Sequence, residues 1–160
     1  MDSNLSLKLG VKGQLKLNAQ AVPMQEGYFK DGGIVAASDG LPFGVVCSAP
    51  AANPNSIVAG KGSGNVIRGI VAFSDDIAQY AIAAPGKYLK GMPCAFIVKG
   101  LVKMQDWETG KDPVIGYKVQ FNDTTGEIGF VASSADASHT LLEGAAVVKV
   151  TDDGAYVWLG

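Results

Sequence analysis

The sequence is poor in the residues on which catalytic and metal sites depend. Its 160 residues include one histidine, two cysteines and two tryptophans, and charged residues make up only 18%. A Ser-His-Asp triad needs a base that is held by an acid and faces a nucleophile, whereas His139 lies in a run of small residues without that pattern. Metal sites need clustered ligands, and Cys47 and Cys94 have no such partners nearby. We therefore expect no enzymatic activity, no metal, no cofactor and no small-molecule substrate, and we interpret His139 as a surface or interface residue.

The sequence also lacks an excess of charge and a long apolar run. The net charge of −2, from 13 basic and 15 acidic residues, is a poor electrostatic footprint for binding nucleic acid. No stretch approaches the about 20 apolar residues that a membrane span needs. The start, Met1-Asp2-Ser3-Asn4, has neither the basic residues nor the apolar run of a signal peptide. The sequence predicts no nucleic-acid partner, no membrane association, and synthesis in a cytoplasm.

Three weaker chemical signals have blander interpretations. Cys47 and Cys94 lie in apolar runs, which favours small buried thiols, although a single disulfide between them stays open. The glycine-rich run at 60–65 is similar to a phosphate-binding loop, but a true one precedes a helix, and Val66 begins a predicted strand. A loop with several carboxylates could touch a cation, but a solvated turn is favoured; its acidic residues are Asp106, Glu108 and Asp112.

Glycine is abundant, with 21 residues, which argues against long helices and for many turns. Short apolar runs between turn signals are typical of a β-sandwich or barrel. Loops rich in Asn, Asp and Gly predict two hairpins, with turns at 122–126 and 152–154. We predict an all-β fold, a small β-barrel or β-sandwich of about nine short strands. Its expected strands are 34–36, 41–47, 66–73, 93–104 (kinked at Gly100), 114–121, 127–131, 145–150 and 156–159, with a loop over 49–65 and a short helical turn within 75–84.

The N-terminal residues form a separate pattern. Over residues 3–18 apolar and polar side chains alternate, and a period of two indicates a strand with one apolar face. The segment is either a hairpin or an extended arm that needs a partner surface, and four lysines in residues 1–30 make it mildly basic. We divide the chain into an N-terminal arm or hairpin, 1–30, and a β-barrel or sandwich domain, 31–160. The candidate partner-binding residues are Leu5, Leu7, Leu9, Leu15 and Leu17.

Several stretches between Gly33 and Leu159 follow one another in a familiar order. They are a Pro-Phe-Gly step before a buried run (41–46), a Gly-Ile-Val strand (67–71), a Gly-Met-Pro step before an apolar strand with a glycine kink (88–102), a hairpin (115–128) and a closing strand (147–150). In this order the chain resembles the structural cement, or capsid decoration, proteins of tailed bacteriophages. The resemblance implies a β-barrel or sandwich without enzymatic activity, in trimers that clamp neighbouring major capsid protein subunits on the outer surface of the virion.

Two alternatives to a capsid decoration protein remain. The chain could be another phage structural β module, such as a head fibre base or a tail-associated protein. It could also be a carbohydrate-binding module with an aromatic platform formed by Trp107, Tyr117, Tyr156 and Trp158. The homotrimer follows from the resemblance alone, and the residues do not separate a trimer from a monomer.

Overall fold

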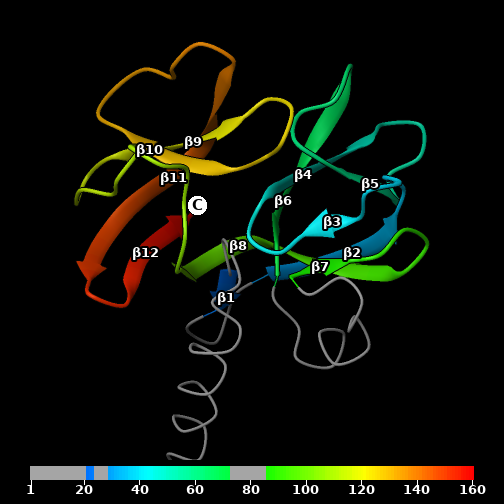
Figure 1. Cartoon of the computed structure of the whole chain (residues 1–160), viewed down its shortest axis with the longest axis horizontal. Coiled ribbons are helices and arrows are strands. Elements are labelled where there is room, and N and C mark those ends of the chain that lie inside the picture. Colours follow the sequence, from blue (N-terminus) through cyan, green and yellow to red (C-terminus); the bar gives the residue numbers. More distant parts are fainter. Residues whose placement is uncertain (1–20, 24–28, 73–85) are drawn as a thin grey trace, which may run out of the picture.

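The computed structural model describes residues 21–23, 29–72 and 86–160, and every element in these ranges is a β-strand (Figure 1). The predicted all-β fold is therefore confirmed. The N-terminal segment 1–18, with its five leucines, and the predicted helical turn within 75–84 lie outside the described residues. The strands are β1 (Ala21–Pro23), β2 (Phe29–Val35), β3 (Leu41–Pro42), β4 (Val46–Pro50), β5 (Ser56–Ala59), β6 (Asn65–Val71), β7 (Lys87–Tyr88), β8 (Pro93–Met104), β9 (Lys118–Asn122), β10 (Ile128–Val131), β11 (His139–Thr151) and β12 (Gly154–Leu159).

Five strands close into a barrel. β8 pairs with β2 on one side and with β6 on the other, and the ring is completed through β5 and β4. Closure leaves these strands with few free edges. Apolar side chains fill the interior because alternate residues of each strand point inward. The buried barrel core consists of Val35, Leu41, Phe43, Val45, Cys47, Ala49, Ile57, Val71, Tyr88, Cys94 and Phe96.

β8 continues beyond the barrel into a second sheet. Its kink falls at Gly100, as predicted, where φ is +119°. Beyond the kink β8 pairs with β12, and the sheet runs on through β11 and β9 to β10, while β1 pairs with Val102–Met104 on the other side of β8. In Figure 1 this sheet lies to the left of the barrel. A second apolar core joins the two layers, with Val46, Ile70 and Ile97 from the barrel against Val119, Phe121 and Val157 from the sheet.

The turn between β9 and β10 also joins the two layers, by direct backbone contact. The Val46 amide of β4 donates to the Gly126 carbonyl at 2.9 Å, and the Lys61 amide donates to the Asp123 carbonyl at 2.8 Å. Gly60 and Gly126 have φ of +76° and +77°. A Cβ on Gly126 would lie 2.5 Å from the Val46 carbonyl oxygen, so only glycine fits this junction.

The structure corrects several predicted strand boundaries. The strand predicted over 41–47 is divided into β3 and β4, because Gly44 turns the chain with φ of +81°. A strand is predicted at 34–36, but β2 begins at Phe29 and includes the Gly32-Gly33 pair. A Cβ on Gly33 would be 2.5 Å from Cγ1 of Ile57. The loop predicted over 49–65 contains β5, and β11 begins at His139 rather than 145. Tertiary packing decides the extent of these strands, because strand propensity depends strongly on context.

Candidate functional site

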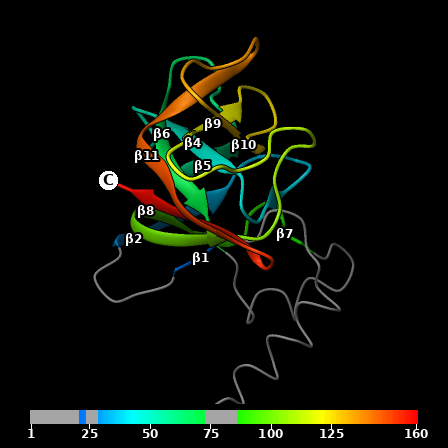
Figure 2. The same cartoon turned by 90° about the vertical axis from the view of Figure 1, so that its left-hand side faces the viewer.

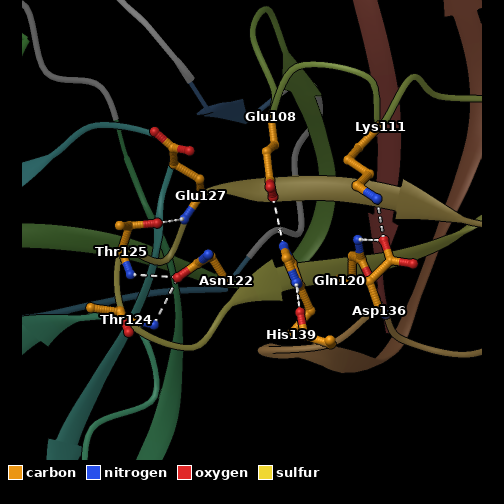
Figure 3. Close-up of polar contacts among 10 residues, drawn as sticks. Glu108, Lys111, Gln120, Asn122, Thr124, Thr125, Glu127, Asp136 and His139 are labelled. Carbon is orange, nitrogen blue, oxygen red and sulfur yellow. Dashed lines mark hydrogen bonds and ion pairs between the residues drawn. The ribbon is translucent and has the colours of Figure 1, made fainter.

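The main polar cluster ties two loops to β9 and β10 (Figure 3). Gln120 of β9 is fully buried. Its Nε2 donates to Oδ2 of Asp136 at 2.8 Å, and the Asp136 amide donates back to its Oε1 at 2.9 Å. Lys111 Nζ lies 2.6 Å from the same carboxylate. The hydrogen bonds from Lys111 and Gln120 lower the pKa of Asp136 below its ordinary value. The cluster thus fixes both loops on the sheet by satisfying a buried amide.

His139 lies in the same cluster and bridges the two loops. Its Nε2 is 2.7 Å from Oε2 of Glu108, and its Nδ1 is 2.7 Å from the Ala137 carbonyl oxygen. The side chain is only 8% exposed, so of the two alternatives predicted, surface or interface, a freely exposed surface histidine is wrong and an interface residue stays a prediction. Burial alone would lower the pKa of His139, but the hydrogen bonds to Ala137 and Glu108, with the charges of Glu108 and Asp136, raise it above its ordinary value. Since both ring nitrogens face acceptors, the imidazolium satisfies both and a neutral ring only one.

This geometry predicts a pH-dependent contribution to stability. A histidine whose pKa is raised by folding stabilises the protein fully at a pH below its unfolded pKa, about 6.5. This stabilisation is lost as the pH rises through the pKa of the folded state. His139→Gln is expected to lower the free energy of unfolding by about 1–3 kcal/mol near pH 5.5, because hydrogen bonds to a charged group are lost. The loss should be smaller near pH 8.5. Urea denaturation of both proteins across this range measures it.

Glu108→Gln is the matched control, since it keeps the imidazole and removes the charge facing it. Its free energy of unfolding should approach that of the wild type as pH rises from about 5.5 to about 8.5. Asp136 and Lys111 also face this region, and neither is changed in either variant. An equal cost of His139→Gln at both ends of the range would contradict the assignment of a protonated ring.

The cluster brings together no nucleophile with a base and no ligand set for a metal. Among the described residues, no group of three or more His, Cys, Asp or Glu side chains could hold a metal ion. Other side chains near the cluster shape the hairpin turn predicted at 122–126. There Asn122 Oδ1 accepts hydrogen bonds from the backbone amides of Thr124 and Thr125 at 2.9 and 3.0 Å. The hydrogen bonds and ion pairs of the cluster hold its loops on the sheet, which is a structural role.

The two cysteines are free and buried, as the sequence favoured, and they form no disulfide. Burial raises the pKa of Cys94 to about 11 and that of Cys47 well above its ordinary range. Both thiols therefore stay protonated at neutral pH, and a thiol without thiolate character is a poor nucleophile. Their role is to fill space in the barrel core.

The loop predicted to carry solvated carboxylates is more ordered than expected. Glu108 pairs with His139, and Asp112 accepts a hydrogen bond from Trp107 Nε1 at 3.0 Å. Asp106 accepts from the Trp107 amide at 2.9 Å. The Trp107 ring packs edge-on against Phe130, with centroids 5.8 Å apart. The acidic side chains thus position the tryptophan and hold the loop.

The four aromatic residues of the predicted sugar platform do not form one surface. Trp107 and Tyr117 pack against the core that joins the two layers. Tyr156 and Trp158 lie on β12 at alternate positions to the buried Ala155, Val157 and Leu159, and therefore point away from that core. The carbohydrate-binding alternative loses its structural motivation.

Tyr156 and Trp158 belong instead to an open face of the second sheet. Cross-strand partners share a face, and one row of partners runs Leu101–Trp158–Ala146–Lys118 across β8, β12, β11 and β9. The neighbouring row is Lys103–Tyr156–Lys149. A β-bulge places Val148 beside this second row. We call these eight residues the outer face; Figure 2 views the molecule from the side on which β11 lies.

The outer face is apolar as well as basic. Val148 is 47% exposed and Trp158 is 40% exposed, and Lys118 and Lys149 are exposed beside them. Sequence reasoning missed this surface, although one signal was present: in the last strand, aromatic residues occupy the positions that alternate with its buried set. The five N-terminal leucines stay a prediction, because they lie outside the described residues. In the described ranges, no helix could cross a membrane.

The comparisons with known proteins bear on the whole chain. A family model described as structural cement protein (E217 gp24/Pam3 gp6) matches residues 3–160. A search of curated proteins found no match. The family match confirms the resemblance seen in the sequence. The resemblance seen in the sequence began near Gly33. The family match begins at residue 3 and therefore also covers most of the N-terminal segment.

Proposed function

Because the chain belongs to the phage structural cement protein family, whose model matches residues 3–160, we propose that it binds the outside of a phage head and stabilises contacts between neighbouring major capsid protein subunits. The family match is the observation that carries this proposal. In this role the protein is not an enzyme. It is made in the cytoplasm of the bacterial host, and it decorates the outer capsid surface of the virion as a homotrimer, the state implied by the resemblance.

The physical basis of cementing is mass action. A protein that binds two neighbouring subunits only in the assembled shell lowers the free energy of that shell and not of the separated subunits. A rigid binder loses little conformational entropy when it docks. A closed barrel that shares a core with a second sheet is the kind of rigid body that such binding favours.

The test uses tailed phage particles that were assembled without this protein. Purified full-length protein is added, and bound and free protein are separated by sedimentation. Cryo-electron microscopy of the decorated heads then locates the added density. The proposal expects density at regular lattice positions on the outer surface of the shell. Unchanged heads, or density at the tail instead, would refute it and favour another phage structural module.

The N-terminal residues provide a more specific prediction. We propose that the arm is the part of the predicted segment 1–30 that precedes β1, since β1 and the start of β2 pair with β8. We propose that it contacts the coat through its leucines, Leu5, Leu7, Leu9, Leu15 and Leu17. An extended segment binds by adding a strand to a neighbour's sheet edge. Deleting residues 1–18 should leave a folded protein that binds heads at least about tenfold more weakly, a loss of about 1.4 kcal/mol.

Circular dichroism and the midpoint of thermal unfolding check the fold of the deletion variant, and sedimentation with heads measures its binding. Leu5→Ser/Leu7→Ser/Leu9→Ser in the full-length chain is the companion variant, because it keeps chain length and removes the apolar stripe. If the deletion variant were unfolded, residues 1–18 would be a core hairpin rather than an arm.

A further inference from the structure

The outer face has the composition of a binding surface. Exposed tryptophan and tyrosine are enriched where proteins bind one another, because each offers a large contact area with a polar handle. Trp158 lies in the central part of its row, between Leu101 of β8 and Ala146 of β11. The exposed Val148 adds apolar area nearby. An apolar centre with charged neighbours is the usual anatomy of a protein interface.

The charge of the outer face is positive. Lys103 lies 3.6 Å from Asp153, a residue of the β11–β12 turn. Within the ranges that the structure describes, Lys118 and Lys149 have no ion-pair partner. The Lys149 ammonium lies 5.5 Å from the centroid of the Tyr156 ring. Two lysines are thus available to a partner, in a chain whose overall charge is −2.

This charge distinguishes among the possible occupants. A second copy that met this face with its own outer face, in a two-fold arrangement, would bring lysines against lysines, and like charges across an interface are costly. In a trimer a different surface of the next copy would meet the face, and the sedimentation of the free protein tests that case. The chain's own N-terminal segment is also basic, with Lys8, Lys12 and Lys16 against Asp2. Electrostatic complementarity instead favours an acidic partner, which would also be steered toward the lysines during encounter.

We propose that the outer face of β8, β12, β11 and β9 binds an acidic, partly apolar surface of the coat subunit, with Trp158 as its apolar anchor and Lys118 and Lys149 as its charged contacts. This inference rests on the proposed function and adds to it the face used and the chemistry of the partner. It is independent of the contacts proposed for residues 1–18.

The test is a charge reversal with a matched control. Lys118→Glu/Lys149→Glu is compared with Lys61→Glu/Lys90→Glu, which reverses two exposed lysines outside the outer face. Both variants change the net charge by the same amount, so any general repulsion from the head is equal. The first should bind heads at least about tenfold more weakly, and the control should bind like the wild type. Raising the salt concentration should weaken the wild type more than the Lys118/Lys149 variant.

Trp158→Ala separates the apolar anchor from the charges. It should also reduce affinity at least about tenfold, while the salt dependence stays that of the wild type. Circular dichroism and thermal unfolding show whether each variant is folded. Trp158→Tyr, which keeps an aromatic ring on the exposed strand, should recover much of the affinity.

The outcomes separate this inference from the proposed function. If wild-type protein binds heads and both lysine variants bind equally well, the face is wrong and the function stands. If the wild type does not bind, both fail. A change in sedimentation of free Lys118→Glu/Lys149→Glu would instead assign the face to contacts between copies. Poor quenching of Trp158 by acrylamide in free Trp107→Phe protein would show that the chain itself covers the face.

Discussion

Replacing Phe96 with alanine is expected to lower the free energy of unfolding by about 3–5 kcal/mol, the usual cost of removing a buried phenylalanine ring. Phe96 lies on β8 with its side chain fully buried in the barrel core. Its strand position pairs with Asp31 of β2 and Val71 of β6, so the ring lies where the barrel closes. The Arg68 guanidinium lies 5.2 Å from the ring centroid, and this cation–π contact would also be lost.

Val98→Ala is the matched control, because it truncates a residue on the same strand that is 38% exposed. Its cost should stay within about 1 kcal/mol, since little buried area is removed. Urea denaturation followed by tryptophan fluorescence measures both variants. Since a domain of this kind has a stability of about 5–15 kcal/mol, Phe96→Ala should remove a large part of it. A loss no greater than that of Val98→Ala would mean that the barrel interior is not the stabilising core.

The second large effect is expected from Gly126→Ala, which should cost about 2–5 kcal/mol. A non-glycine residue in the left-handed region costs about 1–2 kcal/mol, and φ of Gly126 is +77°. Overpacking adds about 1–3 kcal/mol, because the new Cβ would lie 2.5 Å from the Val46 carbonyl oxygen and 2.8 Å from the Gly60 nitrogen. Those two atoms share a 2.8 Å hydrogen bond, so the methyl group would disturb the junction between the two layers.

Gly110→Ala is the control that measures the conformational cost of alanine without a steric clash. Its φ of +80° is close to that of Gly126, but a Cβ at Gly110 would meet nothing within 4 Å. This variant should lose only the conformational cost, about 1–2 kcal/mol. The difference between the two variants measures how tightly the β9–β10 turn docks on the barrel. Equal losses would show that the junction yields without cost and that the layers are joined by their side chains alone.

The same junction bears on the proposed cementing role. The barrel and the second sheet share β8, one core and the backbone contacts of the β9–β10 turn. The outer face is therefore connected to the barrel through several packed elements. A Gly126→Ala protein that remains folded should consequently bind heads more weakly through a less ordered interface.

The amino-acid sequence by itself determined the elements with a strong local pattern. The apolar run over 93–104 and its glycine kink predicted β8, and the Asn, Asp and Gly loops predicted the hairpins β9–β10 and β11–β12. Composition favoured buried thiols over a disulfide. The order of short motifs identified the family. The strand, the hairpins and each single motif depend on residues near one another in the chain, where period and turn chemistry are readable.

Tertiary structure alone decided which distant residues meet. No local signal places Glu108 beside His139, because Glu108 lies on the loop between β8 and β9 and His139 is the first residue of β11, which pairs with β9. The outer face likewise joins residues from β8, β9, β11 and β12, and its existence depends on strand order. Gly33 precedes the strand predicted at 34–36 but lies in β2, where it pairs with Cys94 of β8. Its residue type is set by Ile57 of β5, which occupies the space that a side chain would need. Strand pairing between distant segments is set by packing of the whole core, which local propensity does not encode.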